Sequence, residues 1–350
     1  MEHVKFINLD RHWSEVKSQV LDLADQNLSR GICQRGDITT DVEKRLEFVT
    51  DRQFAVTFGC GTDALAQGLR CLNLPAGSEV LVPAYTFLAT VSAVSLAGLK
   101  PVFVDVDDFY HIDLTDAENK ITSNTRVLLY VTLLGSPAVV GTDVWCSERN
   151  LLLVEDAAQS FGASLANSVF SIFSFSPSKP CTTFGSGGAL LTNNAKIAEL
   201  AELGRLHGKR KNSDSTYNLG INSVMSTVEA SALYVNLDYI EKHIARRRDI
   251  VNNYIGEIAD KFEFPKYRKD CTYSKFVIQC NRRSALAEHL TCNGIQTQVH
   301  YRVLPVEEPI YNQLVPEKCK QLKQSSITLP NCSYMTDAEV EKAIECLKEF

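Results

Sequence analysis

The chain has 350 residues, of which 45% are hydrophobic and 22% charged, and its formal net charge at pH 7 is −6. This length can bury a large core, and the composition is that of an ordinary globular protein. A negative net charge argues against non-specific binding to nucleic acid and against an anionic membrane surface.

Eleven cysteines are scattered along the chain, with no C-x-x-C pair and no His/Cys spacing suited to zinc. We therefore expect reduced thiols, a cytoplasmic location and no metal site. The first residues lack the basic and apolar parts of a signal peptide, and no segment reaches the ~18 apolar residues that a membrane span needs.

Helical patterns come first along the chain. Apolar residues recur at helical spacing over residues 14–28, which predicts an amphipathic helix. Thr40 and Glu43 have the spacing of a capping box, so we expect the next helix to begin at Thr40.

A short strand, a glycine turn and a helix are predicted next, over residues 54–58, 59–61 and from Asp63 onward. Backbone N–H groups and the positive end of the helix dipole converge at such a turn, which makes it a possible phosphate site. Ordinary helix-capping turns use the same residues, so the pattern alone leaves both interpretations open.

Predicted strands over 79–83, 101–106 and 126–134 alternate with helical patterns such as 86–99. This alternation indicates an α/β fold with a mostly parallel sheet and helices on both of its faces. Phe87 follows the first of these strands, where its ring could stack on a flat ligand or join the core.

Two apolar runs end on groups of opposite charge. Residues 151–154 lead to Glu155 and Asp156, and residues 171–175 lead to Lys179. In an open α/β sheet ligands bind beyond the carboxyl ends of the strands, so the acid and the amine would face one site. A structural ion pair is the alternative that two residues alone leave open.

The last third of the chain has a different pattern. A capping box at Ser226 to Glu229 opens what we expect to be one long helix reaching Ile258. Strands over 272–279 and 295–300, a helix over 284–291 and a final helix from Thr336 predict a small α+β domain.

Three segments, EDAAQSFGAS, FSFSPSKP and GSGGALLTN, surround Asp156 and Lys179. In this order they resemble the Asp and Lys signatures of the DegT/StrS family of nucleotide-sugar aminotransferases, which depend on pyridoxal 5'-phosphate (PLP). The resemblance implies a fold type I PLP enzyme of the aspartate aminotransferase superfamily. It also implies a large PLP-binding α/β domain over 1–235, a smaller α+β domain over 236–350, and a homodimer whose subunits share each active site.

The resemblance implies that Lys179 forms a Schiff base with PLP and later serves as general base, while Asp156 keeps the pyridine nitrogen protonated. It implies further cofactor contacts. These are Gly61, Thr62 and Ser174 at the phosphate, Phe87 on the ring, Gln159 at the phenolic oxygen and Asn222 at the phosphate of the neighbouring subunit.

In GIQTQVHY the resemblance makes His300 and Tyr301 candidate sugar contacts. Arg302 stands where relatives have proline, and we expect it to bind a substrate phosphate or the donor carboxylate. The usual arginine and acidic residue after Asn222 are replaced by Val224 and Ser226.

A basic run follows the third segment. Lys209, Arg210 and Lys211 would ordinarily form a solvated face, but they could also meet a diphosphate.

The implied reaction moves an amino group from an amino acid, glutamate by resemblance, to a 3-keto or 4-keto deoxysugar linked to dTDP or UDP. Such a reaction serves amino-sugar and glycan biosynthesis. Three alternatives remain open: a PLP sugar dehydratase, in which relatives replace the lysine with histidine, a non-catalytic PLP-binding regulator, and a sugar-nucleotide binding protein without PLP.

Overall fold

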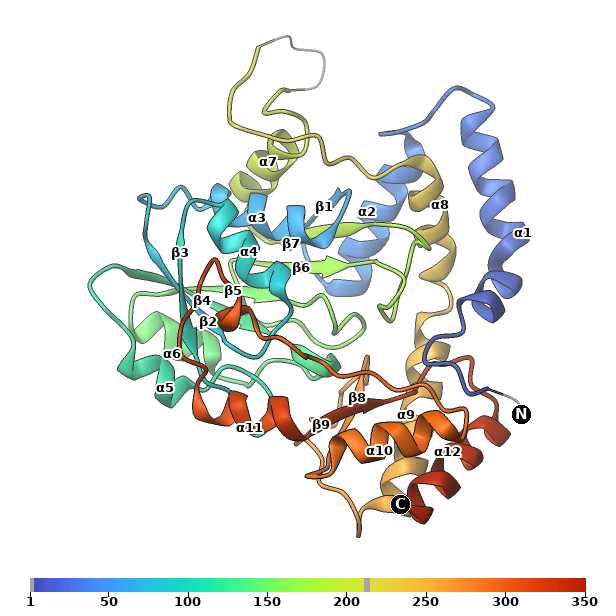
Figure 1. Ribbon diagram of the computed structural model, residues 1–350. Helices are drawn as coiled ribbons and strands as arrows, with labels where there is room; N and C mark the ends of the chain where they lie inside the picture. Colours follow the sequence, from blue (N-terminus) through green and yellow to red (C-terminus); the bar gives the residue numbers. More distant parts are fainter. Residues whose placement is uncertain (1–2, 211–214) are drawn as a thin grey trace.

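The computed structural model describes residues 3–210 and 215–350, shown in Figure 1. Its central sheet has seven strands in the order β1-β7-β6-β5-β4-β2-β3. The strands are β1 (Phe54–Phe58), β2 (Glu79–Pro83), β3 (Lys100–Val104), β4 (Thr125–Val131), β5 (Leu152–Asp156), β6 (Phe170–Ser174) and β7 (Gly188–Thr192). β7 runs antiparallel to β1 and β6, whereas the other pairs are parallel. The predicted mostly parallel sheet is confirmed.

Helices cover both faces of this sheet (Figure 1). The helices of this part of the chain are α1 (Leu9–Leu28), α2 (Asp37–Thr50), α3 (Gly61–Cys71), α4 (Leu88–Leu96), α5 (Leu114–Asn119), α6 (Thr142–Glu148), α7 (Ala195–Gly204) and α8 (Thr227–Asn236), with a 3-10 turn η1 (Leu133–Gly135) after β4. α1 packs along α8 through Val16 and Val20.

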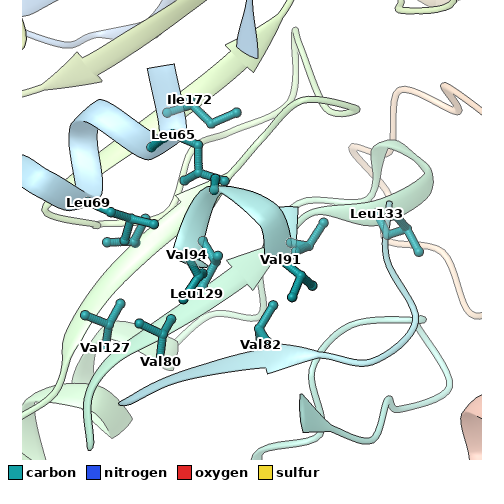
Figure 2. Packing of buried hydrophobic residues seen from close by; sticks show 14 of the residues in the cluster. Leu65, Leu69, Val80, Val82, Val91, Val94, Val127, Leu129, Leu133 and Ile172 are labelled. Atoms are coloured by element: carbon teal, nitrogen blue, oxygen red, sulfur yellow. The ribbon is translucent and has the colours of Figure 1, made fainter. Parts of the chain in front are cut away.

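Successive residues of each strand face opposite sides of the sheet, so neighbours in sequence join different cores. Val80 and Val82 of β2 pack with α3 and α4, as Figure 2 shows, whereas Leu81 packs on the other face with β3, α5 and α6. All three are fully buried. Apolar burial on both faces explains why the predicted strands read as continuous hydrophobic runs.

A second, two-stranded antiparallel sheet lies in the C-terminal part of the chain. It consists of β8 (Phe276–Gln279) and β9 (Ser326–Leu329), surrounded by α9 (Ile240–Ile258), α10 (Arg283–Cys292), η2 (Pro305–Glu307), α11 (Glu317–Ser325) and α12 (Asp337–Glu349). The strand expected over 295–300 is wrong, because this segment makes only isolated bridges, Val4 to Ile295 and Gln298 to Thr328. The division at residues 235 and 236 stays a prediction.

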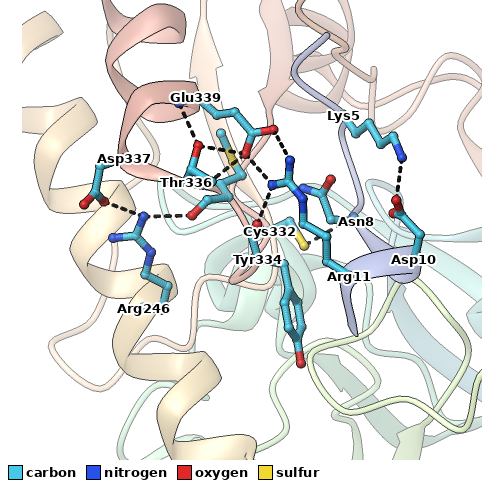
Figure 3. Close-up of polar contacts among 11 residues, drawn as sticks. Lys5, Asn8, Asp10, Arg11, Arg246, Cys332, Tyr334, Thr336, Asp337 and Glu339 are labelled. Atoms are coloured by element: carbon cyan, nitrogen blue, oxygen red, sulfur yellow. Dashed lines mark hydrogen bonds and ion pairs between the residues drawn. The ribbon is translucent and has the colours of Figure 1, made fainter. Parts of the chain in front are cut away.

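The first described residues belong to this C-terminal part. Val4 is 1% exposed and packs in the same core cluster as α9, α10 and α12. Arg11 at the start of α1 makes two hydrogen bonds to the Glu339 carboxylate, at 2.6 and 2.8 Å (Figure 3). Glu339 also closes a capping box with Thr336, which confirms the predicted start of α12.

Two helix predictions are corrected. α2 begins at Asp37 rather than Thr40, because the Glu43 carboxylate does not cap a helix but accepts hydrogen bonds from Thr57 N, Thr57 Oγ1 and Arg205 Nη1 at 2.9, 2.8 and 2.6 Å. The capping box at Ser226 and Glu229 is confirmed.

The expected long helix is two helices, separated by residues 237–239. Arg45 Nη1 donates at 2.7 Å to the Tyr234 carbonyl, which would otherwise accept from the Asp238 amide. That amide turns instead to the Val235 carbonyl, three residues back, and the α-helix stops.

None of the helices within 3–210 and 215–350 combines the length and the apolar character that crossing a bilayer requires.

Candidate active site

A cavity of about 310 Å³ lies at the carboxyl ends of β4, β5 and β6, where the sequence predicted a ligand site. Seven of the predicted cofactor residues line it. They are Gly61, Thr62, Phe87, Asp156, Gln159, Ser174 and Lys179.

Asp156, the last residue of β5, is 5% exposed. Its Oδ2 accepts a hydrogen bond of 2.7 Å from Thr90 Oγ1, and its Oδ1 accepts one of 3.1 Å from the Ala158 amide. Burial raises the pKa of this carboxyl, while the two hydrogen bonds and the Lys179 charge oppose that rise. Both oxygens are therefore held, and a cationic ring nitrogen in the cavity would favour the ionised form.

Lys179 ends a tight turn after β6, in which its backbone amide donates to the Ser176 carbonyl at 3.0 Å. Burial lowers the pKa of its ammonium, and the Asp156 charge counteracts this. A half-buried lysine with a lowered pKa holds its amine in the neutral, nucleophilic form more readily than a surface lysine.

α3 begins at Gly61, so the first amides of an eleven-residue helix point into the cavity region. Cys60 caps the helix, with its Sγ accepting from the Asp63 amide at 3.4 Å. A Cβ on Gly61 would lie 2.9 Å from the Cβ of Ser174 and 3.2 Å from the Phe173 carbonyl oxygen. Only glycine allows this close approach of helix and strand, so the backbone at the start of α3 can line the cavity directly.

Gln159 connects the cavity to the C-terminal part of the chain. Its Oε1 accepts from the Leu134 amide at 3.0 Å, and its Nε2 donates to the Tyr301 hydroxyl at 3.0 Å. The Tyr301 ring lies 6.1 Å from that of Phe87, centroid to centroid. Tyr301 thus meets the cavity through two of its lining residues, although it does not line the cavity itself.

His300 and Arg302 do not line the cavity. His300 is half-buried, its Nδ1 is 2.9 Å from Thr328 Oγ1, and burial lowers its pKa to about 3, with Lys275 and Lys179 adding to the effect. Arg302 is exposed.

Asn222 also lies apart from the cavity of its own chain; it is exposed and forms a bridge with Leu206. The next residue, Ser223, is held at α3, since its Oγ donates to Asp63 Oδ2 at 2.6 Å and accepts from the Gly59 amide at 3.0 Å. The segment that carries Asn222 is therefore fixed to the N-terminus of α3.

Of the basic run at residues 209–211, which could meet a diphosphate, Arg210 already makes contacts within the chain. Arg210 forms an ion pair of 3.0 Å with Glu199 and lies over the ring of Tyr217. Lys209 is exposed, and Lys211 lies outside the described residues.

Sequence reasoning missed several residues that the cavity uses. Thr90 is the most important, because it donates to Asp156, and Thr86 supports it with a hydroxyl 3.1 Å away. The signal was present in the segment PAYTFLAT, where two threonines four residues apart share one side of a helix start. The other missed lining residues include Ser176, Ser186 and Gly187.

Comparison with known proteins agrees with this geometry. The sequence model of the DegT/DnrJ/EryC1/StrS aminotransferase family matches residues 15–348. The chain is 28% identical, over 99% of both chains, to the dTDP-3-amino-3,6-dideoxy-alpha-D-galactopyranose transaminase of Aneurinibacillus thermoaerophilus.

Two solved structures are similar over the whole chain. One is that of DesV from S. venezuelae in complex with a ketimine intermediate, with a TM-score of 0.96 and 28% identity over 100% of this chain and 98% of that one. The other is NtdA from Bacillus subtilis with the bound cofactor PMP, with a TM-score of 0.93 and 26% identity over 100% of this chain and 85% of that one.

Proposed function

The chain belongs to the DegT/DnrJ/EryC1/StrS aminotransferase family, and from this premise we propose that it transfers an amino group to the keto carbon of a nucleotide-linked deoxysugar, using PLP. The observation that carries the proposal is one cavity with an amine, a buried acid and a helix N-terminus around it, contributed by Lys179, Asp156 and Gly61. These groups fit PLP. The cofactor, when bound, supplies an aldehyde that takes up amino groups and a ring that withdraws electrons.

Each residue has a separate task in this proposal. The N–H groups of Gly61 and Thr62 and the hydroxyl of Ser174 would bind the phosphate, because they line the cavity at the start of α3 and the end of β6. Phe87 would cover one face of the ring, and Gln159 would lie at its phenolic oxygen. Asp156 would hold the proton on the ring nitrogen.

Lys179 would bind the cofactor and, once released, move a proton from the α-carbon of the amino acid. Burial favours its neutral amine, the form that can accept a proton. In the second half of the reaction, the same amine would deliver a proton to the sugar carbon that takes up the nitrogen. We propose glutamate as the amino donor.

The substrate and the partner subunit complete the proposed site. His300, Tyr301 and Arg302 would contact the sugar nucleotide, and an exposed Arg302 is free to bind a phosphate or a donor carboxylate. If Arg302→Ala left the KM values of both substrates unchanged, this role would be wrong. Asn222, exposed and outside its own cavity, would reach the phosphate in a second copy, so the active unit would be a homodimer.

We also propose that residues 1–235 form a large domain and residues 236–350 a small one, and that the protein is located in the cytoplasm. The last of these is supported by the eleven free cysteines.

The experiment that tests the function uses the full chain with PLP and glutamate. We expect a visible absorbance that changes when glutamate is added, and borohydride should fix the cofactor to Lys179. A panel of 3-keto and 4-keto sugars linked to dTDP or UDP should yield an aminated product by mass spectrometry, and NMR would locate the new amine.

Lys179→Arg is the matched control, since it keeps the positive charge but cannot bind the aldehyde. Cofactor binding without any aminated product would point to a regulator, and a colourless protein would refute the PLP assignment.

A further inference from the structure

A second lysine lies beside the lysine of the active site. Lys275 immediately precedes β8 and is 7% exposed. Its Nζ donates a hydrogen bond of 3.2 Å to the backbone carbonyl of Ser178, the residue before Lys179. The small C-terminal sheet thereby fixes the turn that presents Lys179 to the cavity.

Within the part of the chain that the structure describes, this amine has no acidic partner. Among the described residues no carboxylate lies within 4 Å of Lys275 Nζ. The Lys275 Nζ lies 5.4 Å from the centre of the Phe6 ring. The ionisable side chains near it are Arg247 on α9, Lys179, His300 and the thiol of Cys332. Buried charges are normally paired, so an unpaired one next to a reactive amine calls for a reason.

Burial lowers the pKa of both the Lys275 and the Lys179 ammonium groups. Burial, with the positive charges of Arg247 and Lys179 acting in the same sense, lowers the pKa of the Lys275 ammonium to about 7. Burial also lowers the pKa of Lys179, which only Asp156 opposes. Two ammonium groups in one desolvated region repel each other, so a proton on either disfavours a proton on the other.

We propose that Lys275 is a positioning residue for Lys179: it anchors the Ser178 carbonyl and, through its charge, keeps the neighbouring amine neutral and nucleophilic. The inference rests on the proposed function, because it concerns the lysine that would bind the cofactor. Lys275 does not line the cavity, and it belongs to none of the sequence motifs at the strand ends. A nearby cation is a known means of activating a lysine nucleophile.

The test compares Lys275→Met with Lys275→Arg in the full chain. Methionine keeps most of the volume and removes the charge and the donor, whereas arginine keeps both. The readout is the visible absorbance of bound PLP as a function of pH. Borohydride fixation of PLP on Lys179 is tested first in the wild-type protein. A failure at that step would refute the proposed function, whereas a later failure would concern only Lys275.

We expect the pH midpoint of the absorbance change to rise by about one unit in Lys275→Met, since a neighbouring positive charge is lost. In Lys275→Arg it should stay within about 0.3 unit of the wild type. A midpoint in Lys275→Met that equals the wild-type value would overturn the proposal, because a purely structural role for Lys275 predicts no shift.

Folding of the variant is checked by its thermal midpoint. We expect Lys275→Met to be at least as stable as the wild type, because an unpaired buried charge is replaced by an apolar group. If it does not fold, Lys275→Gln, which keeps a donor for the Ser178 carbonyl and removes the charge, is measured in its place. A rise of its midpoint by about one unit supports the proposal, and a midpoint equal to the wild-type value overturns it.

Discussion

Thr90 Oγ1 donates a hydrogen bond of 2.7 Å to Oδ2 of Asp156. The two residues are 66 positions apart, one on the first turn of α4 and the other at the end of β5, and both are buried. The hydroxyl satisfies the carboxylate oxygen that the Ala158 amide does not reach, so it favours the ionised acid in a site where burial disfavours charge.

Replacing Thr90 with valine should slow the reaction with glutamate by about 10-fold to 100-fold, since a hydrogen bond to a charged group contributes about 1.5–3 kcal/mol. The rate of the absorbance change on adding glutamate measures this. Thr90→Ser keeps the donor and should retain most of the rate. Thr86→Val is the matched control, because Thr86 bonds Thr90 but not Asp156, and equal losses in the two valine variants would contradict the assigned role.

Gly61→Ala should weaken PLP binding by about 5-fold to 150-fold. The added Cβ would lie 2.9 Å from Ser174 Cβ, so α3 must shift from the strand end, and overpacking of this kind costs about 1–3 kcal/mol. Titration of the apoprotein with PLP, followed by absorbance, measures the affinity. Gly256→Ala on α9 meets no atom within 4 Å and should bind PLP like the wild type; unchanged affinity in Gly61→Ala would exclude the close approach as a requirement.

Glu43→Ala should lower the free energy of unfolding by about 3 kcal/mol, because it leaves the buried Arg205 guanidinium without its main partner. The Arg205 and Glu43 side chains are 6% and 18% exposed. Arg205 also pairs with Glu202, whose side chain is 40% exposed, so Glu202→Ala should cost no more than about 1 kcal/mol. Urea unfolding of both variants gives the comparison, and similar losses would show that burial does not distinguish the two pairs.

His243 should make the protein less stable in mild acid. It is 4% exposed, its Nε2 is 3.0 Å from the Tyr334 hydroxyl, and burial lowers its pKa to about 4, helped by His12 and Arg247. The unfolded chain takes up this proton near pH 6.5 and the folded chain only near pH 4, so stability is full above pH 6.5 and falls as the pH drops towards 4.

Between pH 7 and pH 5 the loss from this histidine should be about 2 kcal/mol. Urea unfolding at several pH values should therefore give a flatter dependence for His243→Gln than for the wild type. His207, which is exposed, provides the control substitution. Parallel curves for wild type and His243→Gln would contradict the prediction.

The sequence predicted the strand ends well because a buried strand that stops on a charged residue is a local feature. Asp156 and Lys179 could be placed at one edge of a parallel sheet from pattern alone, and the cavity between them is confirmed. The capping box at Thr40 failed for a nonlocal reason, since Glu43 is bonded to Arg205, which is 162 residues away in sequence.

Other errors also come from distant partners. The break after α8 depends on Arg45, far upstream, and no residue between 236 and 240 is a proline or glycine that would reveal it. Thr90 and Lys275 escaped notice because their neighbours, Asp156 and Ser178, are 66 and 97 residues away.

The bridge between Val4 and Ile295 has a consequence for how the chain is made. A ribosome synthesises residue 4 long before residue 295. Val4 therefore has no packing partner in the C-terminal core until nearly three hundred later residues have been synthesised. The large sheet, whose last strand ends at Thr192, can form during that interval, but the core that holds Val4 closes only after the C-terminal helices have been synthesised.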